Sequence, residues 1–282
     1  MRKILVPVDF SENSVNALDY AVRIAKEVSG EITVFNSYPI DVPMGMEYSS
    51  GIYMQTLVTE VKLDHELRLK ELVAQYAREY YRFSDESIQI EIKVQEGVAT
   101  DSIVEVAETG NYDLIIMGTQ GASGLEEVLL GSITASVIGK TRVPVLAVPE
   151  DALFTGIDRV VYATDFDEGD VQAIDAVQDF SDSFDAEITC LHISTEAAMA
   201  YAEGQQLDAL RRNYFFTPMS KMNFKLIHKE KVERGLQEYL KDNQIDLVAV
   251  KPRNRGFIEN IFHTSITRKM AFHSTIPVLV AR

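Results

Sequence analysis

The sequence predicts an α/β protein with two tandem doubly wound domains, each with a mainly parallel five-stranded sheet flanked by helices. Three observations predict this. The chain has 282 residues, which suits two domains of ordinary size. Short apolar runs alternate with amphipathic helical stretches, as in parallel sheets covered by helices on both faces. The third observation is that this alternation occurs twice.

The second half of the chain repeats the first. KILVPVDFSENSVNALDYAVRIA aligns without gaps with RVVYATDFDEGDVQAIDAVQDFS, so that Asp9 falls on Asp165. Nearer the ends of the halves, YDLIIMG aligns with IDLVAVK, and GSITASVIGKTRVPVLAVP with TSITRKMAFHSTIPVLVAR. Such self-similarity indicates a duplication. We predict domains at 1–150 and 151–282, joined through EDALFTGI, which carries charges and a glycine before a new strand.

The elements of the first half follow from apolar patterning. KILVPV is a continuous apolar run typical of a buried parallel strand, and Ser11 is placed to cap the helix that follows it. The other expected strands are EITVFNSY, the alternating IQIEIKVQEG, DLIIMG and VPVLAVP. LDHELRLKELVAQYAREYY, DSIVEVAETG and SITASVIGK are expected to be helical, with Gly110 as a C-cap.

The second half is expected to follow the same plan. We predict strands and helices in alternation at 158–164, 171–183, 186–193, 203–214, 222–228, 230–243, 245–250, 265–273 and 277–281. The segment 38–63 is rich in Met, Tyr, Pro and Gly and is longer than typical connections. It is a candidate for a lid over the first site, an interface patch or a mobile loop.

Charge and composition exclude several classes of protein. The net charge is −16, which disfavours binding to phosphate backbones, so no nucleic-acid partner is expected. The single cysteine, Cys190, excludes an intrachain disulfide and a Cys-rich zinc site. No apolar run reaches the ~20 residues of a membrane span, and Pro7 and Asp9 interrupt the N-terminal apolar run. We expect a cytoplasmic protein without a membrane partner.

A glycine-rich segment follows the fourth strand of the first half. Gly118 and Gly121 are followed by nine residues and then by Gly131-Ser132, which opens a helix. Glycines let backbone N–H groups approach an anion, and a helix N-terminus adds free donors and a favourable dipole. The spacing fits neither a Walker A loop nor the dinucleotide fingerprint. It predicts a phosphate cradle; the alternative is that these are turn glycines only.

Two other strand ends are candidate contacts, because ligands of open α/β sheets bind beyond the carboxyl ends of strands. Asp9 ends the first strand and is placed to meet a ribose or a metal, or simply to cap the next helix. Asn36 and Ser37 end the second strand, where an adenine ring would lie, or where an ordinary loop begins.

These segments resemble the universal stress protein family. PVDFS and MGTQGASGLEEVLLGSITASVIGKTRVPVLAVP are similar to that family, and the second block fits its nucleotide motif G-x2-G-x9-G-[S/T]. The likeness covers nearly the whole chain, once per half. It implies a five-stranded doubly wound domain that binds ATP in the nucleotide-binding members, with Mg²⁺ as the expected counterion.

The resemblance also implies a set of contacts. Pro7, Val8 and Asp9 would line the adenosine side, and Ser37 would offer main-chain contacts to adenine. The remaining contacts would lie along the ribose and phosphates: Met117, Gly118, Gly121, Gly131, Ser132 and Ile133.

The second half departs from the motif. Lys251, Asn254 and Thr264 replace its three glycines. Side chains then stand where the backbone must touch phosphate, so we predict that this half does not bind ATP in the family manner. Lys251, Arg253 and Arg255 form a basic cluster that either binds another anion or a partner, or is simply solvated.

Three classes of function remain. The first is an ATP-binding stress-response regulator with its nucleotide in the first half. The second is a slow ATPase; no catalytic residue is evident, and Asp9 with Mg²⁺ would support at most weak hydrolysis. The third is a nucleotide-independent interaction module. Because closing strands leave exposed edges, and family members commonly dimerise through them, the two halves are expected to pair as an internal pseudo-dimer, with a further homodimer possible.

Overall fold

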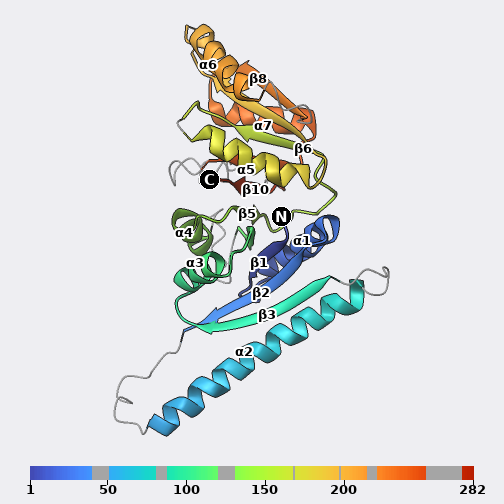
Figure 1. Ribbon diagram of the computed structural model, residues 1–282, viewed down its shortest axis with the longest axis vertical. Coiled ribbons are helices and arrows are strands. Elements are labelled where there is room, and N and C mark those ends of the chain that lie inside the picture. Colours follow the sequence, from blue (N-terminus) through green and yellow to red (C-terminus); the bar gives the residue numbers. More distant parts are fainter. Residues whose placement is uncertain are drawn as a thin grey trace, which may run out of the picture.

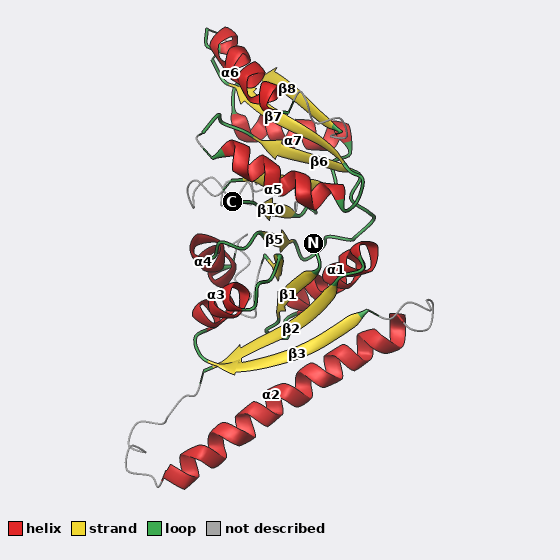
Figure 2. Ribbon diagram, in the orientation of Figure 1, coloured by secondary structure: helices red, strands yellow, loops and turns green. Residues whose placement is uncertain are grey.

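A single ten-stranded sheet runs through the molecule, with helices on both faces (Figures 1 and 2). The computed structural model describes residues 1–39, 51–80, 88–119, 131–167, 169–196, 198–214, 221–251 and 275–282. The strand order is β3-β2-β1-β4-β5-β10-β9-β6-β7-β8. Each half contributes five neighbouring strands, and the order within the second half mirrors that of the first. The predicted tandem doubly wound fold is therefore confirmed.

The first half begins with a strand and a helix that packs back onto it, and continues in the same alternation. Its elements are β1 (Lys3–Pro7), α1 (Glu12–Val28), β2 (Glu31–Tyr38), α2 (Gly51–Tyr80), β3 (Gln89–Glu96), α3 (Ala99–Thr109), β4 (Leu114–Gly118), α4 (Ser132–Lys140) and β5 (Val145–Val148).

The second half repeats this order as far as the structure describes it. Its elements are β6 (Arg159–Ala163), α5 (Asp170–Asp182), β7 (Glu187–Ser194), α6 (Ala200–Asn213), β8 (Met222–His228), α7 (Val232–Asn243), β9 (Leu247–Val250) and β10 (Val278–Val280). None of the helices in the described parts of the chain has the length and apolar character needed to cross a membrane.

The two halves of the sheet are joined by β5 and β10. These strands pair antiparallel, with Leu279 opposite Leu146, whereas the neighbours within each half pair parallel. The strands of the second half therefore run in the opposite direction across this junction. Each half covers the other's closing strand, so neither strand is left as an open edge.

The core has two layers, one on each face of the sheet. Successive residues of β1 point to opposite faces: Ile4 and Val6 pack with α1, whereas Leu5 packs with residues of α3 and α4. All three side chains are fully buried. Helices α1, α2, α5 and α6 share one face, and α3, α4 and α7 cover the other. Burial on both faces explains why these strands are continuous apolar runs rather than alternating ones.

One of the expected helices begins at a different residue, and another lies outside the described residues. Helix α2 begins at Gly51, well before the expected start at Leu63, so much of the segment 38–63 is helix rather than loop. The mixed Met and Tyr composition concealed its helical periodicity. Residues 40–50 and the expected helix at 265–273 lie outside the described residues. The predicted cap of α1 is confirmed, because the Ser11 side chain accepts a hydrogen bond from the Ser14 backbone N–H.

Left-handed backbone conformations recur at matching positions of the two halves. The non-glycine residues with positive φ among the described ones form three aligned pairs: Phe10 (66°) and Phe166 (62°), Ser29 (51°) and Asp185 (55°), Asn111 (51°) and Gln244 (51°). A bulky residue such as phenylalanine rarely adopts this conformation. Its presence in both halves shows that the turn after the first strand of each is held in the same strained form.

Candidate functional site

A cavity of about 330 Å³ opens at the carboxyl ends of β1, β2 and β4, between the starts of α3 and α4. This is where ligands bind in open α/β sheets. The residues lining it are Pro7, Val8, Asp9, Ser14, Phe35, Asn36, Ser37, Ala99, Ile103, Met117, Gly118, Gly131, Ser132, Ile133 and Thr134.

The cavity brings together the residues that the sequence singled out. Every predicted contact residue that the structure describes lines it, from three different strand ends and from the start of α4. Gly121 lies outside the described residues. These residues come from positions more than a hundred residues apart in the sequence, so only the fold makes them neighbours.

The turn after β1 holds Asp9 at the cavity wall. The Val8 N–H donates to the Phe35 carbonyl at 2.8 Å, and the Asn36 amide donates to the Val8 carbonyl at 2.7 Å. Asp9 Oδ1 accepts hydrogen bonds from the Ser11 N–H at 3.1 Å and the Ser11 hydroxyl at 2.5 Å. Asp9 therefore takes part in the turn before α1 and lines the cavity, but the residue that caps α1 is Ser11, so the alternative interpretation of Asp9 as the helix cap is wrong.

The opposite end of the cavity is suited to an anion. Gly131 is the N-cap of α4 and provides no side-chain hydrogen bond to the first N–H groups of that helix. Those N–H groups and the helix dipole attract negative charge. The Thr134 hydroxyl donates to the Gly118 carbonyl at 2.8 Å, which fixes the first turn of α4 against the end of β4.

Several cavity residues were missed by the sequence analysis: Ser14, Phe35, Ala99, Ile103 and Thr134. A signal for two of them existed. Ala99 and Ile103 are four apart on α3, the helix that starts at the same carboxyl edge, so one face of its first turn had to reach the site. The others depend on how helices pack against the strand ends.

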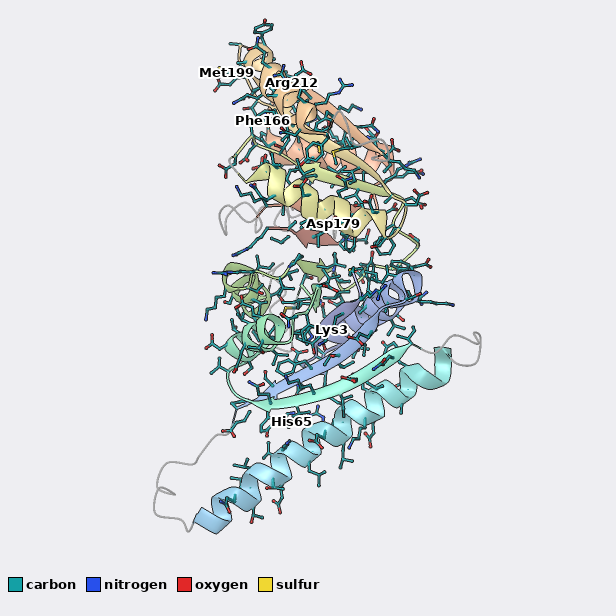
Figure 3. The ribbon with its side chains drawn as sticks, viewed as in Figure 1. Lys3, His65, Phe166, Asp179, Met199 and Arg212 are labelled. Carbon is teal, nitrogen blue, oxygen red and sulfur yellow. The ribbon has the colours of Figure 1, made fainter. Side chains whose placement is uncertain are left out.

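Asn36 is held from the far side by α2. The Nδ1 atom of His65, which projects from α2 toward the sheet (Figure 3), lies 2.7 Å from Asn36 Oδ1. Because Asn36 Oδ1 can only accept, His65 Nδ1 carries the proton. Burial, and secondarily the nearby Arg68 charge, lowers the pKa of His65, which favours the neutral ring.

The second half has a smaller cavity at the matching position. It measures about 220 Å³ and is lined by Ala163, Thr164, Asp165, Asp170, Leu191, His192, Ile193, Val232, Leu236 and Lys251. Most of these align with lining residues of the first cavity, and Lys251 takes the place of Gly118. Its ammonium group pairs with the Asp167 carboxylate, with Nζ and Oδ2 2.9 Å apart. The predicted partners of Lys251 in a basic cluster, Arg253 and Arg255, lie outside the described residues.

The second cavity is also more acidic. Asp170, which aligns with Ser14, is buried and accepts hydrogen bonds from the Tyr162 hydroxyl at 2.9 Å and from the Thr164 hydroxyl. Burial, followed by the Asp170 charge, raises the pKa of the Tyr162 hydroxyl, which therefore stays protonated and donates. A polyphosphate in this cavity would face Asp165 and Asp170, while Lys251, the lysine among the described lining residues, already pairs with Asp167.

The described residues around the two cavities form no metal cluster. Across the described ranges, no group of three or more His, Cys, Asp or Glu side chains is arranged to hold a metal ion. Among the described residues that line the first cavity, Asp9 is the one carboxylate. A Mg²⁺ ion there would fit the usual arrangement of one or two carboxylates plus the phosphates of the ligand.

The comparisons with known proteins all point to the universal stress protein family. The model of the universal stress protein family matches residues 1–149. Universal stress protein MJ0531 of Methanocaldococcus jannaschii is 36% identical over 148 residues, which cover 52% of this chain and 81% of that protein. Universal stress protein MJ0577 of the same organism is 32% identical over 155 residues, covering 52% and 94%. A solved universal stress protein from Archaeoglobus fulgidus shares the whole fold, with a TM-score of 0.67, 18% identity and coverage of 99% and 98%.

Proposed function

The chain belongs to the universal stress protein family, and from this premise we propose that its N-terminal half, residues 1–150, binds ATP with Mg²⁺ as a stress-response regulator in the cytoplasm. The observation that carries the proposal is the convergence of strand ends, Gly118 and the α4 N-terminus on one cavity. One end of that cavity is walled by apolar side chains such as Phe35 and Ile103. The other presents backbone donors.

The residues divide the work by their chemistry. Val8 and Ser37, at the ends of adjacent strands, would flank the adenosine, and the Asn36–His65 contact would fix the end of β2. The first N–H groups of α4 and the Ser132 hydroxyl would donate to phosphate oxygens. Asp9 would hold Mg²⁺, which neutralises phosphate charge when it is bound. Among the lining residues that the structure describes, Asp9 is the one candidate for a general base, so we expect turnover to be slow at most.

The proposal for the second half, residues 151–282, is different. We propose that it does not bind ATP, because Lys251 fills the place of Gly118 and Asp170 adds negative charge. The antiparallel pairing of β5 with β10 supports an internal pseudo-dimer in which this half serves as the partner of the first. In such an arrangement, one half of the chain would bind ATP and the other half would not.

Nucleotide content tests both statements. Freshly purified, heat-quenched protein is analysed by mass spectrometry, and nucleotide-free protein is titrated with ATP and Mg²⁺. We expect about one ATP per chain. About two would contradict a silent second half, and ADP formed during the titration would indicate slow hydrolysis. Failure of both binding measurements would favour the nucleotide-independent interaction module.

A matched variant checks the location of the site. Gly131→Val places a bulky side chain at the start of α4, where the backbone must approach phosphate. We expect the binding of ATP to be abolished while the circular dichroism spectrum is retained. Unchanged binding by this variant would show that the phosphate site lies elsewhere.

A further inference from the structure

A side chain from the second half of the chain contacts α4, the helix whose first residues line the first cavity at the end suited to an anion. Arg282 follows β10, and its Nη2 atom donates a hydrogen bond to the Ile138 carbonyl at 2.6 Å. The two residues lie 144 positions apart in the sequence. The half that is proposed not to bind ATP therefore touches the helix that is proposed to hold the nucleotide.

The Ile138 carbonyl needs a donor from outside its own helix. Helix α4 ends at Lys140, so its last carbonyls have no N–H partner in a following turn. In a longer helix, the Arg142 N–H would donate to the Ile138 carbonyl, but here it donates to Glu108 Oε1 at 3.2 Å. Arg282 supplies the missing donor, and its positive charge suits the negative end of the helix dipole.

The buried face of α4 also packs at the junction of the two halves. Val137 and Ile138 belong to a buried apolar cluster that includes Val278 and Val280 of β10, together with side chains of β5 and β9. The second half thus contributes apolar side chains to the core beneath α4 and the Arg282 guanidinium to its last turn.

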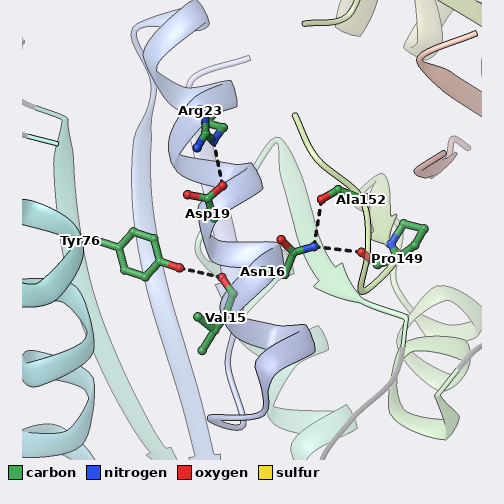
Figure 4. Close-up of polar contacts among 7 residues, drawn as sticks. All are labelled: Val15, Asn16, Asp19, Arg23, Tyr76, Pro149 and Ala152. Atoms are coloured by element: carbon green, nitrogen blue, oxygen red, sulfur yellow. Dashed lines mark hydrogen bonds and ion pairs between the residues drawn. The ribbon is translucent and has the colours of Figure 1, made fainter. Parts of the chain in front are cut away.

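Another polar contact near the junction lies on the other face of the sheet and does not involve α4. The Asn16 amide of α1 donates to the carbonyls of Pro149 at 3.0 Å and Ala152 at 3.1 Å, in the segment between β5 and β6 (Figure 4). From the same segment, the Phe154 ring packs edge-on against Tyr20 of α1, with ring centroids 5.0 Å apart. This contact ties the connecting segment to the first half and offers a matched control.

Both ends of α4 are therefore fixed by side chains. The helix has nine residues, which span about 13 Å at 1.5 Å per residue. In its first turn, the Thr134 hydroxyl donates to the Gly118 carbonyl at 2.8 Å, and in its last turn Arg282 holds the Ile138 carbonyl. A helix held in this way keeps its first N–H groups in one orientation, so less order has to be imposed when an anion binds to them.

From these contacts, and resting on the proposed ATP site, we propose that Arg282 is a positioning residue of that site. By holding the last turn of α4, it keeps the N–H groups of the first turn directed toward the phosphates. Arg282 does so without touching the ligand. The half that does not bind ATP then contributes to the affinity of the half that does.

The experiment compares Arg282→Ala and Arg282→Lys with the controls Lys140→Ala and Asn16→Ala in the full chain. ATP with Mg²⁺ is titrated calorimetrically, and the hydrogen exchange of the α4 amides is measured in each nucleotide-free protein. For Arg282→Ala we expect the affinity for ATP to fall about fivefold and the α4 amides to exchange faster. Arg282→Lys keeps the charge and a donor, so it should recover most of the affinity.

The two controls separate this contact from its surroundings. Lys140→Ala removes a positive charge from the same turn, where Lys140 Nζ pairs with Asp101 Oδ1 at 2.7 Å within the first half. Asn16→Ala removes the contact with the connecting segment and should lower the unfolding temperature. Neither control should change the affinity for ATP by more than about twofold.

Three results would overturn the inference. One is wild-type affinity in Arg282→Ala, and another is unchanged exchange of the α4 amides in that variant. The third is a loss of affinity in either control as large as that in Arg282→Ala, which would mark a general effect of the junction or of charge. If the wild-type chain itself does not bind ATP, the proposed function fails and the inference with it; faster exchange in Arg282→Ala would then show only that Arg282 fixes α4.

Discussion

The two cavities occupy matching places in the two halves but differ in what fills the end of the fourth strand. In the first, Gly118 leaves room for Asn13 and the cavity measures about 330 Å³. In the second, Lys251 extends over Gly169 to Asp167 and the cavity measures about 220 Å³. In the second half, the contact between the end of the fourth strand and the start of the first helix is therefore still present, but it is made by a different pair of residues.

One backbone contact is the same in the two halves. Asp113 Oδ2 accepts the backbone N–H groups of Arg2 and Lys3 at 2.7 and 2.9 Å. Asp246 Oδ2 does the same for Asp158 and Arg159, both at 2.9 Å. The duplicates thus keep the contacts that hold the first strand to the fourth and change those around the cavity. The two halves therefore share these scaffold contacts and differ around their cavities.

The largest effect is expected from copying the lysine into the first half. Gly118→Lys would force a side chain against Asn13 and should destabilise the protein by about 3 kcal/mol, as overpacking does. The binding of ATP should be lost. Adding Asn13→Gly reproduces the pair found in the second half and should recover most of the stability but none of the binding. Thermal unfolding and calorimetric titration measure both quantities.

The corresponding change in the second half is the control. Lys251→Ala should leave the affinity for ATP unchanged, because that half is proposed to be silent. If Gly118→Lys kept its affinity, or if Asn13→Gly failed to recover stability, the reciprocal exchange between the two halves would not be the feature that separates them.

A smaller loss of stability, equal in the two halves, is expected when the matching aspartates Asp113 and Asp246 are replaced. Asp113→Ala and Asp246→Ala each remove an exposed carboxylate that accepts two backbone N–H groups. We expect each to destabilise the protein by about 1 kcal/mol. Urea or thermal unfolding of the two variants side by side checks this. Markedly unequal losses would show that the halves differ in their scaffolds as well as in their cavities.

The smallest effect at neutral pH is expected at Cys190, which aligns with Val34 of the first half. Cys190→Val makes the two cores alike and should change stability by less than about 1 kcal/mol at pH 7. Burial, and secondarily the Asp170 charge, raises the pKa of the Cys190 thiol to about 12, from 9.0. A raised pKa favours the folded state below pH 9 and costs stability as pH rises from about 9 to about 12.

The contribution of Cys190 to the pH dependence of stability can be measured by comparing the wild type with Cys190→Val. At pH 10 the unfolded thiol ionises while the folded one does not, so the wild type should lose about 1.4 kcal/mol relative to Cys190→Val. Urea unfolding of both at pH 7 and pH 10 measures the difference. An equal response to pH would mean that Cys190 ionises as readily in the folded state.

Much of the fold and of the candidate site could be predicted from local patterns. The buried strands are continuous apolar runs such as ILV at 4–6, and the cap at Ser11 follows from its residue type. The start of α2 at Gly51 could not be predicted, because the first turns of that helix lack a clear amphipathic pattern. The cavity residues Ser14, Phe35 and Thr134 also could not be predicted, because they depend on how helices pack against the strand ends, which no local pattern records.

The sequence by itself determined the alternation of strands and helices, the duplication, and the loss of the motif glycines from the second half. These are properties of neighbouring residues or of direct repetition along the chain. Only the tertiary structure decided that β5 joins β10, that Lys251 pairs with Asp167, and that Asn13 lies against Gly118 without a partner. The physical reason is that each of these contacts joins residues about 85 to 135 positions apart, and their distance is set by how the sheet and its helices pack.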